Sequence, residues 1–211
     1  LPLAVAATAS EHLQLLTSVA IAFPRSPMVV ANLGWDLQSA SGGRFVLGLG
    51  SQVRGHNERR FSVPWSAPAP RLSEYIAALR AIWRCWKEGS KLNFEGKYYK
   101  FTLMTPAFVP EPMPSPPPAV TIGAVGPAML GLAAEVCDGV RLHPFCTQRY
   151  QENVVGPIVA KGLGGRGLAR ENFEITGGGF IATALYAQDN HALFVTASPP
   201  KGRAEKGFLL P

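Results

Sequence analysis

VTIGAVGPAMLGLAAEVCDGVRLH, residues 120–143, decides the fold because it joins a strand to a helix through a glycine-lined turn. An apolar run ends at Ile122, Gly-Ala-Val-Gly follows, and Pro127 suits the first position of a helix. Such a turn has two explanations. It is an ordinary tight connection, which glycine permits, or a place where main-chain N–H groups at a helix start bind a phosphate. The pattern alone leaves both open.

The segments on either side continue an alternation of strand and helix. Apolar or β-branched runs predict strands at 13–23, 45–50, 120–123, 138–143 and 173–183. Helical spacing and capping signals predict helices from Pro27 to the Ser-Gly-Gly-Arg stop at 41–44, and at 68–86, 127–137 and 148–161. A hairpin around Glu95 and Gly96 and a proline-rich loop at 105–118 complete the central part of the chain. Strict alternation predicts a parallel α/β fold.

Apolar residues at three- and four-residue steps predict the buried face of each helix. The expected core positions are Val30, Leu33 and Leu37, then Leu72, Ile76, Leu79, Trp83 and Trp86, then Met129, Leu132, Ala133 and Val136.

Ligands of parallel α/β folds gather at the carboxyl ends of the strands, so the residues just after each strand are the candidate site. One such turn, GLGSQVRGH at 48–56, matches neither G-x-G-x-x-G, because position 53 is valine, nor a Walker loop. A basic group beside this turn could meet an anionic ligand or form a solvated face, and both remain open. Its members are Arg54, His56, Arg59 and Arg60.

The histidines give little direct evidence of chemistry. No two of the four stand at metal-ligand spacing, so no metal site is expected. His143 follows a predicted strand and is a weak candidate for a general acid or base, with no partner visible in the sequence. Ser51 lies outside a G-x-S-x-G elbow, which argues against a serine hydrolase.

Composition indicates a globular domain. The 211 residues are 47% hydrophobic, and no apolar run is long enough to span a bilayer. The opening segment at 1–16 lacks a basic region, so it is not expected to be a signal peptide, and three cysteines without metal spacing suit a cytoplasmic location. The net charge of +6 is scattered, so neither nucleic acid nor membrane is an expected partner.

Four stretches together resemble one family. They are GRFVLGLGSQ, RLSEYIAALRAIW, NFEGKYYKF and TIGAVGPAMLGLAAEVCDGV, and they occur in the order found in bacterial luciferase-like oxidoreductases, most closely the branch that uses coenzyme F420. The resemblance covers residues 1–183 and leaves 184–211 as an irregular tail. It implies an α/β fold, a TIM (β/α)8 barrel, here incomplete: the first two strands are expected to precede Leu1, and the last strand to be missing.

The resemblance also implies where the cofactor lies. Family members hold the cofactor phosphate on the turn matching Gly123, Ala124, Val125 and Gly126, with Pro127 opening the helix. They carry a strand bulge beneath the deazaflavin ring, often with a non-proline cis peptide, and Ser18 and Val19 match it. Gly50 and Ser51 match the turn on the other side of the ring. The phosphate explanation of the opening turn is therefore preferred.

The implied activity is hydride transfer between the deazaflavin F420 and a small organic substrate. An FMN-dependent monooxygenase acting on paired donors with molecular oxygen, and a non-catalytic truncated barrel, are the alternatives. One branch of the family carries a glutamate near the position of Val53, so its sugar-phosphate dehydrogenase activity is not supported. That branch keeps a catalytic histidine on strands expected before Leu1. A homodimer is usual in the family.

Overall fold

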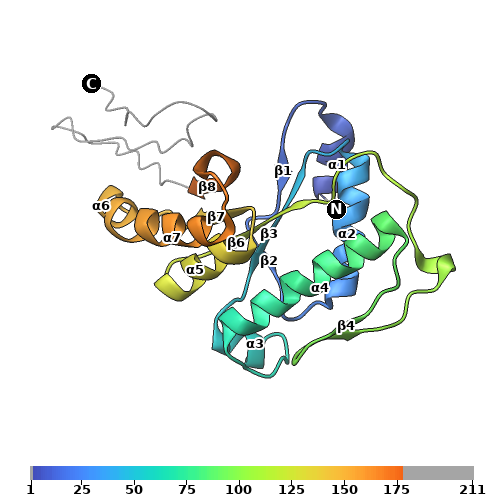
Figure 1. Cartoon of the computed structure of the whole chain (residues 1–211), viewed down its shortest axis with the longest axis horizontal. Helices are drawn as coiled ribbons and strands as arrows, with labels where there is room; N and C mark the ends of the chain where they lie inside the picture. The colour runs from blue at the N-terminus through green and yellow to red at the C-terminus, as the bar shows by residue number, and fades with distance from the viewer. Residues whose placement is uncertain (1, 178–211) are drawn as a thin grey trace. The chain divides into compact units, whose positions relative to one another are not determined.

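The computed structural model describes residues 2–177, in which helices and strands alternate along the chain. They divide into two compact units, unit 1 up to Gly123 and unit 2 from Ala124 onward. The elements of unit 1, shown in Figure 1, are α1 (Pro2–Ala9), β1 (Leu15–Leu16), β2 (Ala20–Ile21), α2 (Pro27–Ala40), β3 (Phe45–Gly50), α3 (Arg54–Arg59), α4 (Pro68–Glu88), β4 (Phe94–Glu95), β5 (Lys100–Phe101), a 3-10 turn at Pro106–Phe108, and β6 (Ala119–Gly123).

Strand β3 is the centre of the sheet in unit 1. It pairs in parallel with β1 and β2 on one side and with β6 on the other, which confirms the predicted parallel arrangement. The segment expected to be one strand at 13–23 is instead two strands of two residues each. The strand is interrupted between them, and a cis peptide bond joins Ser18 to Val19 in this interruption. Apolar composition alone did not reveal this break.

Helices α2 and α4 pack against each other beside this sheet (Figure 1). Every predicted core position of α4 is buried, from Leu72 to Trp86. The predicted face of α2 is wrong, because Leu33 is 53% exposed and only Val30 of the expected stripe is fully buried. The buried face instead includes Ala31, Gly34 and Trp35, and a Cβ on Gly34 would lie 3.2 Å from Cζ2 of Trp83. A large side chain there would keep the two helices apart.

The cap of α2 and the connection after it agree with the sequence. The Ser26 hydroxyl accepts a hydrogen bond from the Met28 amide, with Pro27 in the first turn of the helix. Gly42 and Gly43 end the helix with positive φ angles of 63° and 90°.

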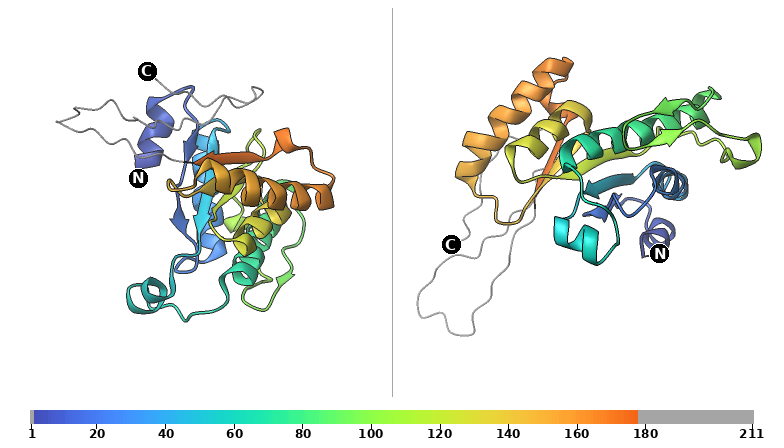
Figure 2. Two further views of the ribbon diagram at one scale, coloured as in Figure 1. Left: turned by 90° about the vertical axis from the view of Figure 1, so that its left-hand side faces the viewer. Right: turned by 90° about the horizontal axis from the view of Figure 1, so that it is seen from below.

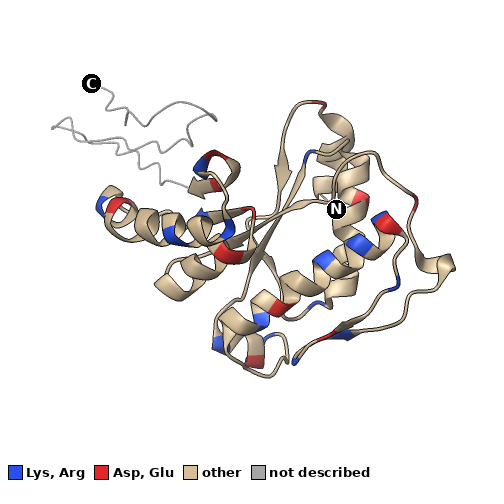
Figure 3. Ribbon diagram, in the orientation of Figure 1, with Lys and Arg blue, Asp and Glu red and all other residues tan. Residues whose placement is uncertain are grey.

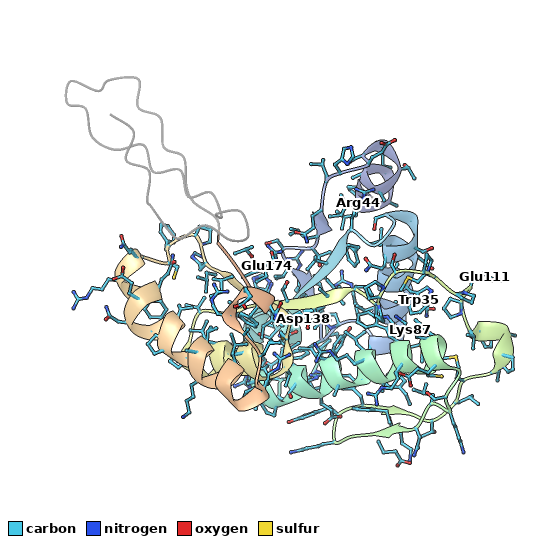
Figure 4. All side chains as sticks on the ribbon, turned by 45° about the horizontal axis from the view of Figure 1, so that its top comes forward. Trp35, Arg44, Lys87, Glu111, Asp138 and Glu174 are labelled. Carbon is cyan, nitrogen blue, oxygen red and sulfur yellow. The ribbon has the colours of Figure 1, made fainter. Side chains whose placement is uncertain are left out.

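The proline-rich loop lies along α2, and polar side chains of that helix hold it. Trp35 Nε1 donates to the Glu111 carbonyl at 3.1 Å, and Figure 4 labels both residues. Gln38, 2% exposed, donates from Nε2 to the Pro116 carbonyl and accepts from the Phe45 amide through Oε1. A segment without regular backbone pairing is therefore fixed by side chains.

A single arginine ties the start of the chain to β3. The Arg44 guanidinium donates to the carbonyls of Leu13, Ala7 and Ser10 at 2.6, 3.1 and 2.5 Å, and to its near neighbour Ser41 at 2.7 Å (Figure 4). Its five donors in a fixed plane suit this role better than a lysine.

The hairpin of β4 and β5 is antiparallel, as predicted, and Glu74 of α4 holds its turn. One Glu74 oxygen accepts the amides of Tyr98 and Tyr99 at 2.6 and 2.7 Å, and the other accepts the Lys97 amide at 2.9 Å. The carboxylate also fills the space next to Gly96, where a Cβ would clash with it. Any other residue at that position would displace the Glu74 carboxylate from the turn.

Among its described residues, unit 2 contains two helices and two strands of the predicted pattern, together with short helical pieces. They are α5 (Pro127–Val136), β7 (Gly139–Leu142), α6 (Gln148–Tyr150), a π-helical segment at Gln151–Val155, α7 (Gly156–Arg166), a 3-10 turn at Arg170–Asn172, and β8 (Glu174–Gly177). The predicted helix at 148–161 is thus present and extends to Arg166. The strand expected at 173–183 begins as β8, and its remainder, like the tail at 184–211, lies outside the described residues. The division at residue 183 remains a prediction.

Helices α5 and α7 lie side by side in both views of Figure 2 and contact each other extensively. A Cβ on Gly162 would clash with Ala134, so the close approach needs glycine there. The predicted core face of α5 is partly wrong: Leu132 and Ala133 are buried, whereas Met129 and Val136 are only half-buried. Leu130 and Ala134 are buried in their place. In residues 2–177, no helix is long and apolar enough to cross a membrane.

Replacing Glu74 by glutamine tests the tie between α4 and the hairpin. We expect Glu74→Gln to lower the free energy of unfolding by about 1–3 kcal/mol, because three hydrogen bonds lose their charged acceptor. The measurement is urea denaturation followed by circular dichroism. Glu88→Gln, at the exposed end of the same helix, is the control and should change stability by less than about 0.5 kcal/mol. Equal stability of the two variants would contradict this role of Glu74.

Candidate functional site

The carboxyl-end edge of the sheet in unit 1 brings together three of the predicted site residues. A Cβ on Gly50 would lie 2.5 Å from Cγ2 of Val19, and one on Gly123 would lie 3.5 Å from Cγ1 of the same side chain. Val19 follows the cis peptide bond and is 39% exposed. The bulge predicted at Ser18 and Val19 is therefore present, and its valine lies over two strand-end glycines.

Thr17 holds the sheet together where β1 and β2 are interrupted. Its hydroxyl donates to the Gly48 carbonyl at 2.7 Å and accepts from the Gly48 amide at 2.9 Å. Beyond the break, the Ala22 amide donates to the Gly50 carbonyl at 2.9 Å. The side chain of Thr17 thus takes the place of main-chain pairing next to the bulge. Thr17 was not among the residues predicted from the sequence, where its signal is a polar residue within an apolar strand.

The turn after β3 is positioned by an asparagine. Asn57, fully buried in α3, donates from Nδ2 to the carbonyls of Ser51 and Val53 at 3.0 and 3.3 Å. Gln52, between them, has a φ of 58°, in the left-handed region where a non-glycine residue needs such support. Asn57 therefore fixes the turn that carries Gly50 and Ser51. It was also missed, because its partners are main-chain atoms that sequence does not display.

In unit 2, the first turn of α5 presents main-chain N–H groups without partners. Among the described residues, none accepts a hydrogen bond from the amides of Val125, Gly126 or Ala128. All three residues are exposed, and a Cβ on Gly126 would meet nothing within 4 Å. Pro127 lies in the same turn and has no N–H to contribute.

Two further hydrogen bonds hold this turn in place. The Ala124 amide donates to the Arg141 carbonyl at 3.0 Å, and the Tyr150 hydroxyl donates to the Val125 carbonyl at 2.7 Å. The amides that remain free lie at the positive end of the helix dipole, where an anion is stabilised. The arrangement can hold a phosphate through the main chain alone.

The other polar candidates are exposed. His143 lies in the turn after β7, where its Nδ1 accepts the Phe145 amide at 3.2 Å and its ring stacks on that of Phe145, with centroids 5.4 Å apart. In the basic group, Arg54 forms an ion pair with Glu58 at 3.1 Å. Figure 3 shows Lys and Arg distributed over several elements rather than gathered on one. A solvated face is the better interpretation of the basic group.

Metal-binding residues do not gather in the part of the chain that the structure covers. Within residues 2–177, no three His, Cys, Asp or Glu side chains lie where they could hold a metal ion together.

The fold and the site define a class of protein. It is a parallel α/β protein that has a bulged strand beside strand-end glycines and a helix whose first turn has free main-chain amides. The sequence profile of one family, described as luciferase-like monooxygenase, matches residues 1–201. The chain belongs to this family, which confirms the resemblance.

Two relatives have sequences similar to this chain. An uncharacterized protein of Mycobacterium tuberculosis is 50% identical over 183 residues, which are 87% of this chain and 54% of the relative. A 5,10-methylenetetrahydromethanopterin reductase of Archaeoglobus fulgidus is 32% identical over 152 residues, 71% of this chain and 41% of the relative. The chain thus spans about half the length of the curated relatives it matches.

Solved structures agree with the fold. An F420-dependent secondary alcohol dehydrogenase, solved with an F420-acetone adduct, superimposes with a TM-score of 0.69 at 18% identity, over 82% of this chain and 51% of that one. The predicted fold is therefore confirmed: the chain has the architecture of a luciferase-like TIM barrel and covers part of it.

Replacing Thr17 by valine tests its role at the break in the sheet. Thr17→Val preserves the shape of the side chain and removes both hydrogen bonds to Gly48, so we expect a loss of about 1–3 kcal/mol in the free energy of unfolding. Urea denaturation measures it. The exposed Thr102 supplies the control, Thr102→Val, which should be nearly neutral. If both variants unfold at the same urea concentration, Thr17 does not hold β3.

Proposed function

We propose that this chain is the cofactor-binding part of a coenzyme F420-dependent oxidoreductase that acts on a small organic substrate. The free amides of Val125, Gly126 and Ala128 carry the proposal, because they offer a phosphate three donors at a helix start. The likeness to a putative coenzyme F420-dependent oxidoreductase of Mycobacterium tuberculosis, 29% identical over 94% of this chain and 58% of the relative, supports the choice of cofactor. The bound deazaflavin would supply the hydride chemistry.

The protein's own task is to bind and orient. The amides at the start of α5 would hold the phosphate. The side chain of Val19, with Gly50 and Ser51 nearby, would give the ring an apolar surface at the strand ends. Thr17 and Asn57 act as positioning residues, since their hydrogen bonds fix the bulge and the turn that the ring would meet. His143 stays a candidate proton donor or acceptor, exposed after β7.

An FMN-dependent monooxygenase is the second candidate, and the description of the family favours it. FMN also carries a phosphate, so the amides at α5 serve either cofactor. Titration of the protein with each, followed by fluorescence of the cofactor, separates the two. Tight binding of FMN without binding of F420 would overturn the choice of F420.

A non-catalytic truncated barrel is the third candidate. A thermal melt by circular dichroism tests it: a cooperative transition that shifts upward with F420 supports a binding-competent fold. We also propose a cytoplasmic location. We further propose that the protein is a homodimer, and size-exclusion chromatography with light scattering would test this oligomeric state.

Substitution of Gly126 tests the phosphate site without disturbing the helix. Aspartate and asparagine are both better N-cap residues than glycine, so Gly126→Asp and Gly126→Asn should keep or slightly raise the melting temperature. The two side chains have nearly the same shape, and only aspartate places a negative charge beside the phosphate. We therefore expect Gly126→Asp to weaken F420 binding at least about tenfold more than Gly126→Asn does. Affinities of both variants equal to that of the unmodified protein would exclude phosphate binding at this turn.

A further inference from the structure

We propose that Arg141 and Thr176 form a binding site for a carboxylate of the substrate, on the face of the β7–β8 pair that Glu174 shares. The inference deepens the proposed oxidoreductase function, on which its reference to a substrate rests. It identifies the substrate class as organic acids.

The register of the strands places these side chains together. Arg141 pairs with Thr176, and Gly139 pairs with Glu174, in a parallel ladder. Side chains alternate between the two faces of a strand, so Arg141, Thr176 and Glu174 share one face. The other face carries Val140, Leu142 and Ile175, the composition expected beneath α5 and α7.

Three polar atoms on the first face are buried and have no hydrogen-bond partner among residues 2–177. They are Nε and Nη2 of Arg141, whose side chain is 11% exposed, and Oγ1 of Thr176. The Glu174 carboxylate approaches Nη2 only to 3.7 Å, beyond hydrogen-bonding distance. Leaving such donors unsatisfied costs stability, and native proteins keep few of them. They indicate a ligand.

The chemistry of these donors identifies the ligand. Nε and Nη2 form one edge of the guanidinium, which binds both oxygens of a carboxylate in parallel hydrogen bonds. Burial lowers the pKa of Arg141 and the Glu174 carboxylate opposes this shift, but arginine remains charged at neutral pH. The Thr176 hydroxyl offers a further donor beside it.

The position suits a substrate-binding residue. Arg141 is the last residue but one of β7, near the carboxyl end where ligands of such barrels bind. Its own carbonyl accepts the amide of Ala124, which begins the turn proposed to hold the cofactor phosphate. A structural ion pair with Glu174 explains the geometry less well, because such a pair gains most from close bidentate contact. Figure 4 labels Glu174 on β8.

Acetate is the probe for this site, used with the full chain at constant ionic strength. The shift of the Arg141 Nε–Hε NMR signal should saturate with a Kd on the order of 10 mM. We expect Arg141→Met, followed through neighbouring amide signals, to weaken acetate binding at least about tenfold, and Arg141→Lys to weaken it less. Arg149→Met, which removes the same charge from an exposed position of α6, is the control and should not change the Kd. Circular dichroism confirms that each variant is folded.

Glu174→Gln separates a ligand site from a structural pair. Removing the competing carboxylate should tighten acetate binding about three- to tenfold, whereas Glu171→Gln, an exposed control, should not change it. No saturable shift in the unmodified protein, or equal Kd values for Arg141→Met and Arg149→Met, would overturn the proposal. So would an unchanged Kd in Glu174→Gln.

A second titration, with F420 bound, distinguishes substrate from cofactor as the source of the carboxylate. An unchanged acetate Kd supports a substrate site. Displacement of acetate by F420, together with loss of F420 affinity in Arg141→Met, would assign the site to the cofactor's own acidic groups and overturn the substrate assignment. Failure of F420 to bind while acetate still binds would refute the proposed function and leave the carboxylate site standing.

Discussion

Parallel pairing of β3 on both of its sides is the constraint on which unit 1 depends. Parallel strands end at the same edge of a sheet, so the residues that follow β2, β3 and β6 meet there although they lie far apart in sequence. Val19, between β1 and β2, lies over Gly50 and Gly123, the last residues of β3 and β6, where glycine leaves room for its side chain. The bulge that delivers Val19 is stable because Thr17 replaces the missing main-chain contacts with its hydroxyl.

A different constraint shapes the start of α5. Pro127 sets the helix start and Gly126 brings no side chain, so the amides of this turn stay open to solvent. A main-chain hydrogen bond to the Arg141 carbonyl and a hydrogen bond from the Tyr150 hydroxyl to the Val125 carbonyl keep the turn fixed. A rigid turn needs little reordering when an anion arrives, which favours binding. Each unit, taken by itself, thus offers one feature that suits the proposed cofactor: unit 1 has an apolar side chain at its sheet edge, and unit 2 has a turn with free amides.

Long, periodic elements could be predicted from the sequence, and the helix α4 and the strand β3 are found where the pattern places them. The buried face of α2 could not be predicted from apolar spacing. Close contact with Trp83 requires a small residue, Gly34, on that face, and the larger Leu33 is exposed. The break in the first strand came from resemblance rather than from residue pattern. Asn57 was missed because its bonds reach main-chain atoms, and Arg141 because only the register with β8 reveals its surroundings.

The central claim is that main-chain N–H groups at the start of α5 bind the phosphate of a redox cofactor. Titration of isotope-labelled protein with F420, followed by amide NMR, tests it most directly. The account predicts that the signals of Val125, Gly126 and Ala128 move and saturate together, at the concentration where fluorescence reports binding of the cofactor. Saturation of the fluorescence while these three amides stay unmoved would contradict it.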